Sequence, residues 1–199
     1  MTGRVRTGVL ISGRGSNMSA LIEAARNKDF PAEIALVLSD KPQAAGIRAA
    51  QLAGVAALGL DAKRFAGKPE FEAAMTVALA AAEAELICLA GFMRILSPAF
   101  VERWRGRILN IHPSLLPDLR GLQTHERALA EGRAEHGCTV HFVTADLDAG
   151  PIVAQARVPV LPGDDADRLA ARVLVEEHRL YPEALATVAR AIRAGRGAE

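Results

Sequence analysis

The stretch GVLISGRGSNMSALIEAARNK, residues 8–28, sets the pattern that decides the fold. Its first five residues form an apolar run that predicts a buried strand. Residues 17–28 repeat apolar side chains at the spacing of one helix face, which predicts an amphipathic helix. Two glycines, Gly13 and Gly15, separate the two segments. A strand, a glycine-rich turn and a helix in this order are typical of a parallel sheet covered by helices.

The same alternation continues along most of the chain. Further strands are expected over 33–38, 55–60, 85–90 and 106–111, and helices over 44–53, 69–84, 98–104, 123–131 and 165–193. Near the C-terminus the rhythm changes, and residues 137–144 and 151–160 are expected to form two strands joined by a tight Asp-Ala-Gly turn. The sequence therefore predicts an α/β, Rossmann-like three-layer fold, with a mostly parallel sheet and antiparallel edge strands near the C-terminus.

Composition narrows the class of protein. The 199 residues are 50% apolar and 24% charged, and the formal net charge is +1. This balance is typical of a single globular domain spanning 1–199, and it argues against a nucleic-acid partner, which would favour a basic surface. The sequence has no apolar run of membrane-spanning length, so we expect a cytoplasmic protein without a membrane partner. Cys88 and Cys138 stand in apolar contexts and are expected to be buried free thiols.

The turn after the first expected strand could bind a phosphate group. Backbone N–H groups at a helix N-terminus, with Ser and Asn side chains beside them, form a ready anion site, here at Gly15, Ser16 and Asn17. The turn is not a dinucleotide fingerprint, because Met18 occupies the third glycine position, and no Gly-Lys-Ser/Thr follows as in a Walker A loop. The alternative is a plain tight turn in which Ser16 caps the helix.

A second segment, NIHPSLLP, follows the expected strand over 106–111. Asn110 and His112 are two residues apart, so their side chains lie on the same face of a strand. An amide N–H can stabilise a developing oxyanion, and an imidazole can transfer a proton near neutral pH. The pair suits acyl transfer. The alternative is a histidine at a strand end that is hydrogen-bonded to a loop carbonyl.

Two further loops follow expected strands. In residues 144–150, Asp148 precedes Ala-Gly, where the backbone can approach closely, and a carboxylate facing His112 would favour its imidazolium form. Asp146 is expected to be solvated. Residues 90–96 are apolar around Arg94, which favours either a ligand pocket or a core loop. No metal site is expected, because His136 and His141 lie on opposite faces of a strand and His125 is distant from both in sequence.

These segments together resemble the phosphoribosylglycinamide formyltransferase family, folate-dependent enzymes of purine synthesis. The matching motifs, which run in order from about Val9 to Pro182, are SGRGSN at 12–17, LAGFMRIL at 89–96, NIHPSLLP at 110–117 and LDAGP at 147–151. The resemblance implies transfer of a formyl group from the co-substrate 10-formyltetrahydrofolate to the amino group of glycinamide ribonucleotide, with no metal. It implies small-molecule partners and a monomer or homodimer.

The resemblance also implies roles for residues at matching positions. Asn110 would stabilise the oxyanion, His112 would be the general acid, and Asp148 would keep His112 protonated or order a water that shuttles the proton. The ribonucleotide would contact Gly15, Ser16, Asn17 and Glu177. The folate would contact Lys68, Met93, Arg94, Ile95, Leu96, Asn110, Thr144, Ala145, Asp146, Leu147 and Asp148. The N-terminal half, about 1–100, would bind the nucleotide phosphate, and the half at about 101–199 would carry the folate site and catalysis.

The sequence departs from the family pattern at two places. Gln123 stands where well-known members often have His, which puts a helper imidazole there in doubt. Lys68 stands where the family commonly has Arg, so its contact with the folate tail is an expectation only. The loop 118–124 is expected to move over bound substrate.

Three rival functions are weighed against the transferase. Formyltetrahydrofolate hydrolase shares the Asn, His and Asp residues but usually carries a regulatory domain ahead of the catalytic one, whereas here the first strand begins within ten residues. Methionyl-tRNA formyltransferase would need a further C-terminal domain. A non-catalytic nucleotide-binding module would explain the glycine-rich turn, but it leaves the combination of Asn110, His112 and Asp148 unexplained.

Overall fold

The computed structural model describes residues 3–195; residues 1–2 and 196–199, which the expected domain of 1–199 includes, lie outside the described residues. The strands are β1 Val5–Ile11, β2 Ala32–Ser39, β3 Ala57–Gly59, β4 Leu86–Leu89, β5 Ile108–His112, β6 Glu135–Phe142 and β7 Ile152–Pro159. The helices are α1 Ser16–Ala25, α2 Ala45–Leu52, α3 Lys68–Ala81, α4 Pro98–Arg103, α5 Thr124–Ala130 and α6 Ala166–Arg193, with a 3-10 turn over Ala62–Arg64.

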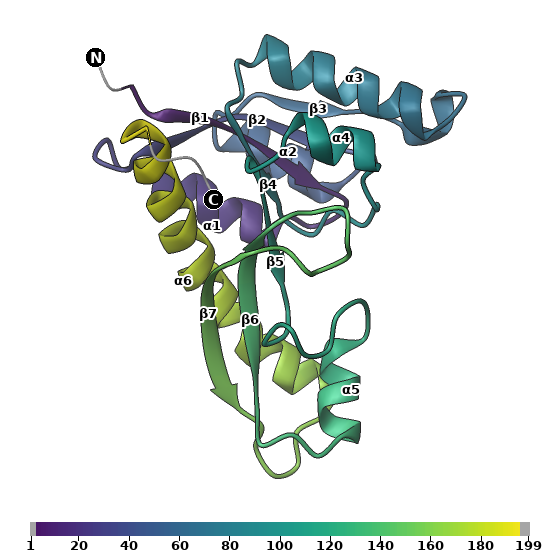
Figure 1. Ribbon diagram of the computed structural model, residues 1–199, viewed down its shortest axis with the longest axis vertical. Helices are drawn as coiled ribbons and strands as arrows, with labels where there is room; N and C mark the ends of the chain where they lie inside the picture. The colour runs from purple at the N-terminus through teal and green to yellow at the C-terminus, as the bar shows by residue number, and fades with distance from the viewer. Residues whose placement is uncertain (1–2, 196–199) are drawn as a thin grey trace.

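All seven of these strands form one sheet, in the order β3-β2-β1-β4-β5-β6-β7 (Figure 1). β1 to β5 pair in parallel, whereas β6 runs antiparallel to β5 and β7 antiparallel to β6. The expected mixed sheet is confirmed. The change of direction falls at β5, so the carboxyl end of β5 lies between a parallel and an antiparallel neighbour.

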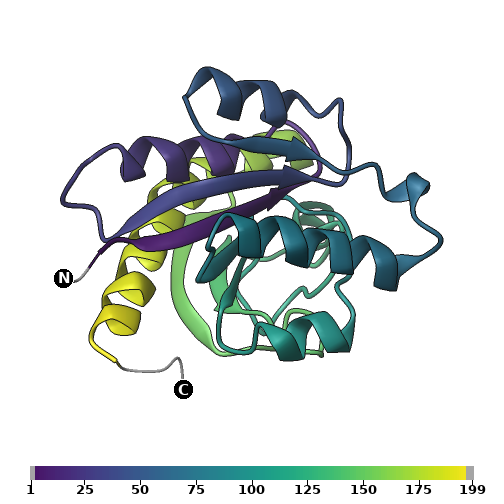
Figure 2. The same ribbon diagram turned by 90° about the horizontal axis from the view of Figure 1, so that it is seen from above.

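Helices cover both faces of the sheet (Figure 2). On one face Val9 and Ile11 pack in a core cluster with buried residues of α1, α2 and α6. On the other face Leu10 packs with Phe71 of α3 and with the α4 region. Successive side chains of a strand point to opposite faces, so a strand buried on both sides needs an unbroken apolar run. This explains why the run over 8–12 predicts the centre of the sheet.

Helix α6 is tied to the centre of the sheet by Tyr181. This residue is fully buried, and its hydroxyl lies 3.0 Å from the carbonyl oxygen of Leu89 and 3.1 Å from that of Leu109. Burial raises the pKa of the Tyr181 hydroxyl well above its ordinary value, which keeps it a hydrogen-bond donor. The contact holds α6 against the end of β4, which leads into the loop at 90–96, and against Leu109 of β5, the residue before Asn110.

The connection between β6 and β7 is longer than expected. The prediction of a tight turn over 148–150 is wrong, because the connection runs over 143–151. It crosses in front of β4 and β5 in Figure 1. It starts along β5, since the Val143 N–H donates to the Ile108 carbonyl at 2.9 Å. It ends at Gly150, where any side chain would collide with the Phe142 carbonyl oxygen. Between these points the loop folds back over the face of β5.

Several element boundaries differ from expectation by up to three residues. β1 begins at Val5 rather than Gly8, because Val5 already pairs with Ala32 of β2. Arg6 hides this extension in the sequence, and its guanidinium is held at 2.6 Å by the Glu33 carboxylate. α1 ends at Ala25 instead of residue 28.

The two cysteines are free and buried, as expected. Burial raises the pKa of both the Cys88 and Cys138 thiols to about 12. Within residues 3–195, no helix has both the length and the apolar character that a membrane-spanning segment needs.

Candidate active site

Asn110, His112 and Asp148 come together at the carboxyl end of β5. His112 Nδ1 lies 3.4 Å from Asp148 Oδ2. His112 is 5% exposed and the Asp148 side chain 8%, so the two groups face each other largely away from water. The expected proximity of the loop carboxylate to the strand-end histidine is confirmed. Asp146, two residues earlier in the loop, is exposed, as expected.

Both ring nitrogens of His112 face hydrogen-bond acceptors. Nε2 lies 3.0 Å from the Leu119 carbonyl oxygen, which can only accept, so Nε2 carries a proton. Nδ1 faces the Asp148 carboxylate. A neutral ring has only one N–H and can donate to one of these acceptors, whereas the imidazolium has two and can donate to both. The loop-carbonyl contact, which is the alternative to a role of His112 in acyl transfer, is thus present together with the carboxylate partner.

The loop 118–124 contacts both members of this pair through its backbone. Leu119 supplies the carbonyl to His112, and the Gly121 N–H donates to Asp148 Oδ2 at 3.0 Å. The loop contains three residues with positive φ, namely Leu119, Gly121 and Gln123. Gln123 precedes α5 in the left-handed region without a side-chain capping bond. The loop thus reaches His112 and Asp148 with main-chain groups, and no side chain at position 123 is needed for that contact.

His141 is part of the site, and sequence reasoning missed it. It lies on β6 directly opposite Asn110 in the antiparallel register, and only 2% of it is exposed. Its Nε2 lies 3.2 Å from Asn110 Nδ2 and 3.6 Å from Asp148 Oδ1. Burial lowers the pKa of His141, which favours the neutral imidazole. The sequence contains one indication of this contact, because residues 110 and 141 lie on strands that are expected to follow one another. The register of the two strands, which places the residues opposite each other, could not be predicted from it.

The glycine-rich turn forms an open helix N-terminus. Gly15 has φ 75° and precedes α1, and α1 has no side-chain capping bond, so the alternative in which Ser16 caps the helix is wrong. Asn17 instead donates from Nδ2 to Glu177 Oε2 at 2.6 Å. Burial raises the pKa of the Glu177 carboxyl, and the bond from Asn17 opposes that rise. The turn thus joins Glu177 of α6, while its first N–H groups are left without intrahelical partners.

The loop at 90–96 lies against this turn. The Ser12 N–H donates to the Gly91 carbonyl at 3.1 Å, and the Met93 N–H donates to Ser12 Oγ at 2.8 Å. Arg94 is turned toward the protein, with Nε 3.0 Å from Asp40 Oδ2 and its guanidinium 5.3 Å from the centre of the Phe71 ring. These contacts fix the loop beside the glycine-rich turn and engage the Arg94 side chain.

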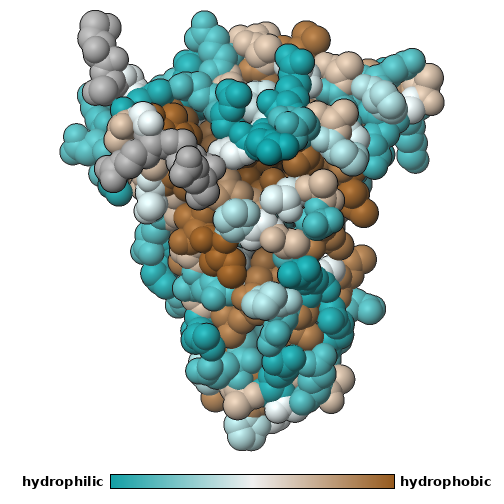
Figure 3. Space-filling view, viewed as in Figure 1, coloured by the Kyte–Doolittle hydropathy of each residue, from teal (hydrophilic) through white to brown (hydrophobic). Residues whose placement is uncertain are grey.

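Large apolar side chains are exposed around the site. Met93, Ile95 and Leu147 are 70%, 69% and 56% exposed, and Leu96 is half-buried. Figure 3 shows apolar side chains gathered across the middle of the molecule, below the wide end that carries α3 and α4. Exposed apolar clusters of this kind mark ligand grooves or interaction sites. The other expected folate contacts that are exposed are Lys68 at the start of α3, Arg94, Thr144, Ala145 and Asp146.

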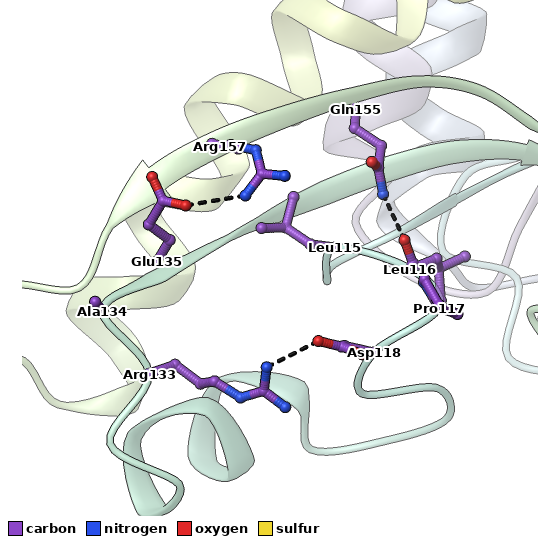
Figure 4. A pocket seen from close by; sticks show the side chains of 9 residues that line it. All are labelled: Leu115, Leu116, Pro117, Asp118, Arg133, Ala134, Glu135, Gln155 and Arg157. Atoms are coloured by element: carbon purple, nitrogen blue, oxygen red, sulfur yellow. Dashed lines mark hydrogen bonds and ion pairs between the residues drawn. The ribbon is translucent and has the colours of Figure 1, made fainter.

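A hollow of about 360 Å³ lies elsewhere, between the chain leaving β5 and the strands β6 and β7 (Figure 4). None of the expected site residues lines it. Its charged side chains pair with one another, Arg157 with Glu135 at 2.9 Å and Arg133 with Asp118 at 2.8 Å. Gln155 donates to the Leu116 carbonyl at 2.8 Å. These contacts hold the chain as it leaves β5.

Two further histidines pair beside the loop. His125 Nδ1 lies 3.1 Å from His136 Nε2, and burial lowers the pKa of both, that of His136 to about 4. Over residues 3–195, there is no group of three or more His, Cys, Asp or Glu side chains arranged to hold a metal ion.

Comparisons with known proteins agree with the fold. A model of the family described as Formyl transferase matches residues 5–185, which defines the class of protein. Phosphoribosylglycinamide formyltransferase of Escherichia coli is 47% identical over 174 residues, covering 87% of this chain and 82% of that protein. The crystal structure of phosphoribosylglycinamide formyltransferase from Brucella melitensis is 55% identical, with a TM-score of 0.90, and the match covers 94% of this chain and 96% of that one. The chain therefore belongs to the formyl transferase family and, within it, to the phosphoribosylglycinamide formyltransferases, which are enzymes.

Some relatives are much longer. The trifunctional purine biosynthetic protein adenosine-3 of Drosophila melanogaster is 50% identical over 185 residues. The match covers 92% of this chain but spans only 14% of the length of that protein.

Proposed function

We propose that this chain transfers the formyl group of 10-formyltetrahydrofolate to the amino group of glycinamide ribonucleotide, a step of purine synthesis. The observation that carries the proposal is the convergence of Asn110, His112 and Asp148 at the carboxyl end of β5. Family membership supports it, because relatives bear the name of that activity. We further propose that the protein works in the cytoplasm on small molecules, as a monomer or homodimer.

The reaction needs no covalent enzyme intermediate. The amine of the ribonucleotide attacks the formyl carbon, and a tetrahedral intermediate with a negatively charged oxygen forms. The bond from that carbon to the folate nitrogen then breaks. The attacking amine gives up one proton, and the departing folate nitrogen takes up one, so the protons balance overall. Holding the two substrates together can contribute about 7–11 kcal/mol to lowering the barrier.

Asn110 stabilises the oxyanion in this scheme. Its side-chain nitrogen carries two protons, of which one is directed to His141 and the other is available to the substrate. A donor placed where charge develops contributes about 3 kcal/mol. Because β5 is held on both sides by neighbouring strands, the amide is carried on a rigid element.

His112 is the general acid, and Asp148 keeps it charged. The carboxylate stabilises the imidazolium at Nδ1, while the Leu119 carbonyl holds Nε2. Proton delivery requires one of these two contacts to open, or a water ordered by Asp148 to carry the proton. Movement of the loop 118–124 would release Nε2, which gives this loop a part in the catalytic cycle.

The ribonucleotide would lie with its phosphate at Gly15, Ser16 and Asn17. The N-terminus of α1 offers N–H groups there, and the helix dipole favours an anion. Glu177 is held beside this turn by Asn17 and would accept hydrogen bonds from hydroxyl groups. The phosphate site thus belongs to the half at about 1–100, apart from Glu177.

The folate would bind between the loops at 93–96 and 144–148. Exposed Met93, Ile95 and Leu147 offer apolar contact for a flat ring, and the backbone offers polar groups. Lys68 would contact the acidic tail of the folate from the start of α3. Because Ser12 joins the loop at 90–96 to the glycine-rich turn, the formyl donor and the acceptor would lie beside each other.

The test is folate release, followed by absorbance, with 10-formyltetrahydrofolate present and glycinamide ribonucleotide added or withheld. Turnover only with the ribonucleotide is the expected result. Turnover without it would instead indicate a hydrolase, and no turnover in either case would refute the proposed acceptor and its phosphate site. An unchanged rate in His112→Ala would refute the assigned general acid.

A further inference from the structure

We infer that His141 is a positioning residue that fixes the orientation of the Asn110 amide. This inference rests on the proposed function, in which Asn110 donates to the oxyanion. His141 is 2% exposed, and its Nε2 lies 3.2 Å from Asn110 Nδ2 while its Nδ1 faces the Phe142 carbonyl oxygen. It acts through Asn110.

The pairing of β5 with β6 brings the two side chains together. Asn110 and His141 are direct partners in an antiparallel register that is continuous from Leu109 to His112. Directly opposed residues of an antiparallel pair have their side chains on the same face, about 4.5–5.5 Å apart at Cβ. The ladder on the other side of β6, toward β7, shifts register between Val140 and His141. Such irregularities are common beside active sites, where they set the direction of side chains.

The backbone determines which nitrogen of His141 carries the proton. Nδ1 lies 2.9 Å from the Phe142 carbonyl oxygen, which only accepts, so Nδ1 is the donor. In the neutral ring Nε2 must then be the acceptor. Nε2 is the atom that lies 3.2 Å from Asn110 Nδ2. Each of these two hydrogen bonds joins a donor to an acceptor, and they run from the Asn110 amide through the ring to the backbone. Asp148 Oδ1 also faces Nε2, but at 3.6 Å it lies beyond hydrogen-bond distance.

This tautomer sets the direction of the Asn110 amide. The two ends of an asparagine amide are nearly the same in shape, and a flip exchanges donor for acceptor. With Nε2 of His141 as acceptor, the amide nitrogen must face it, and the second N–H of that nitrogen remains for the substrate oxygen. With the amide flipped, a carbonyl oxygen would face the lone pair of Nε2. His141 thus favours the orientation in which Asn110 can act as a donor.

Two variants separate this role from a structural one. His141→Phe keeps a flat ring of similar size and removes the acceptor, whereas His141→Gln supplies an amide oxygen that can accept. We expect kcat to fall on the order of tenfold or more in His141→Phe, with the KM values of both substrates changed much less. His141→Gln should recover most of the lost kcat. Equal losses in both variants, or a rise in KM with unchanged kcat, would overturn the inference.

The double variant with Asn110→Ala tests whether His141 acts through Asn110. In that background His141→Phe should have little further effect on kcat, because the amide it orients is gone. Independent effects that multiply would show that His141 acts by another route. Because this comparison uses ratios of rates, it stands even if both variants lose some stability, and thermal unfolding of each variant gives that loss separately.

A spectroscopic measurement tests the contact without any reaction. In protein labelled with ¹⁵N at histidine and asparagine, the His141 resonances, identified by their loss in His141→Gln, should show a protonated Nδ1 and a bare Nε2 at neutral pH. The Asn110 side-chain NH₂ resonances should shift in His141→Phe. A protonated Nε2 would overturn the inference. If the wild-type enzyme shows no formyl transfer, the proposed function fails, and the inference then stands or falls as an account of the Asn110–His141 contact by these resonances.

Discussion

Replacement of Asp148 by Asn is the most direct test of the charged pair in the site. The substitution removes one negative charge 3.4 Å from His112 Nδ1 and keeps the shape of the side chain. Asp148 has φ 49°, a left-handed conformation that Asn tolerates better than other L residues, so little backbone strain is added. The amide oxygen of Asn can still accept from the Gly121 N–H. The change is therefore mainly electrostatic.

The expected loss follows from the distance between the two groups. At an effective dielectric constant of about 20, two unit charges 3.4 Å apart attract by about 5 kcal/mol. Since about 1.36 kcal/mol corresponds to tenfold in rate, this attraction sets an upper limit of about 3.5 orders of magnitude. Part of it is offset by the cost of burying both groups. We expect kcat to fall roughly 10²- to 10³-fold, with smaller changes in the KM for the ribonucleotide.

The assay is ribonucleotide-dependent folate release at saturating concentrations of both substrates. Asp167→Asn is the matched control, because it removes one exposed carboxylate charge in the first turn of α6, and its kcat should stay close to that of the wild-type enzyme. If the Asp148→Asn variant has the thermal unfolding temperature of the wild type and a kcat within about threefold of it, the reasoning is refuted. The attraction between Asp148 and His112 would then not contribute to the reaction.

Three further predictions concern other parts of the molecule. Cys88 and Cys138, with thiol pKa values of about 12, should resist alkylation by iodoacetamide at pH 8 and react after unfolding, which intact-mass measurement checks; labelling of the native protein would contradict their burial. Glu177→Gln should raise the thermal stability at pH 7–8. Burial raises the pKa of the Glu177 carboxyl in the folded state above its ordinary 4.5, so the wild type loses stability as the pH rises from 4.5 through the folded-state pKa. The gain should vanish toward pH 4, and a gain independent of pH would refute the reasoning. Proteolysis within 118–124 should slow when both substrates are bound, and an unchanged cleavage rate would refute closure of this loop.

The arrangement of the sheet was predictable because its central strands are buried on both faces. Such strands need unbroken apolar runs, and the runs near Val9 and Leu86 stand out from the amphipathic segments between them. The same logic fails at the edges and ends. Arg6 interrupts the apolar pattern although it lies inside β1, where its guanidinium is paired with the Glu33 carboxylate of β2. Pairing between distant segments of the chain can therefore extend a strand beyond its visible pattern.

The site was predictable where a residue's neighbours in sequence restrict its geometry. Asn110 and His112 share a face because a strand has a period of two, and Asp148 precedes the small residues that allow close approach. His141 was not predictable in the same way. Its place opposite Asn110 depends on the register of two strands separated by the loop 118–124 and α5, and a shift of one residue would turn it to the other face.

The wrong prediction of a tight turn and the geometry of the site have one cause. β6 runs antiparallel to β5, so its last residue, Phe142, pairs with Leu109 and lies away from the carboxyl end where His112 stands. A tight turn there would leave a carboxylate several residues short of His112, at a rise of about 3.3 Å per residue. The connection over 143–151 instead folds back along β5 and brings Asp148 to within 3.4 Å of His112 Nδ1. We therefore expect deletions in this loop to abolish catalysis while leaving the paired strands intact, because the length of the loop is what the reaction requires.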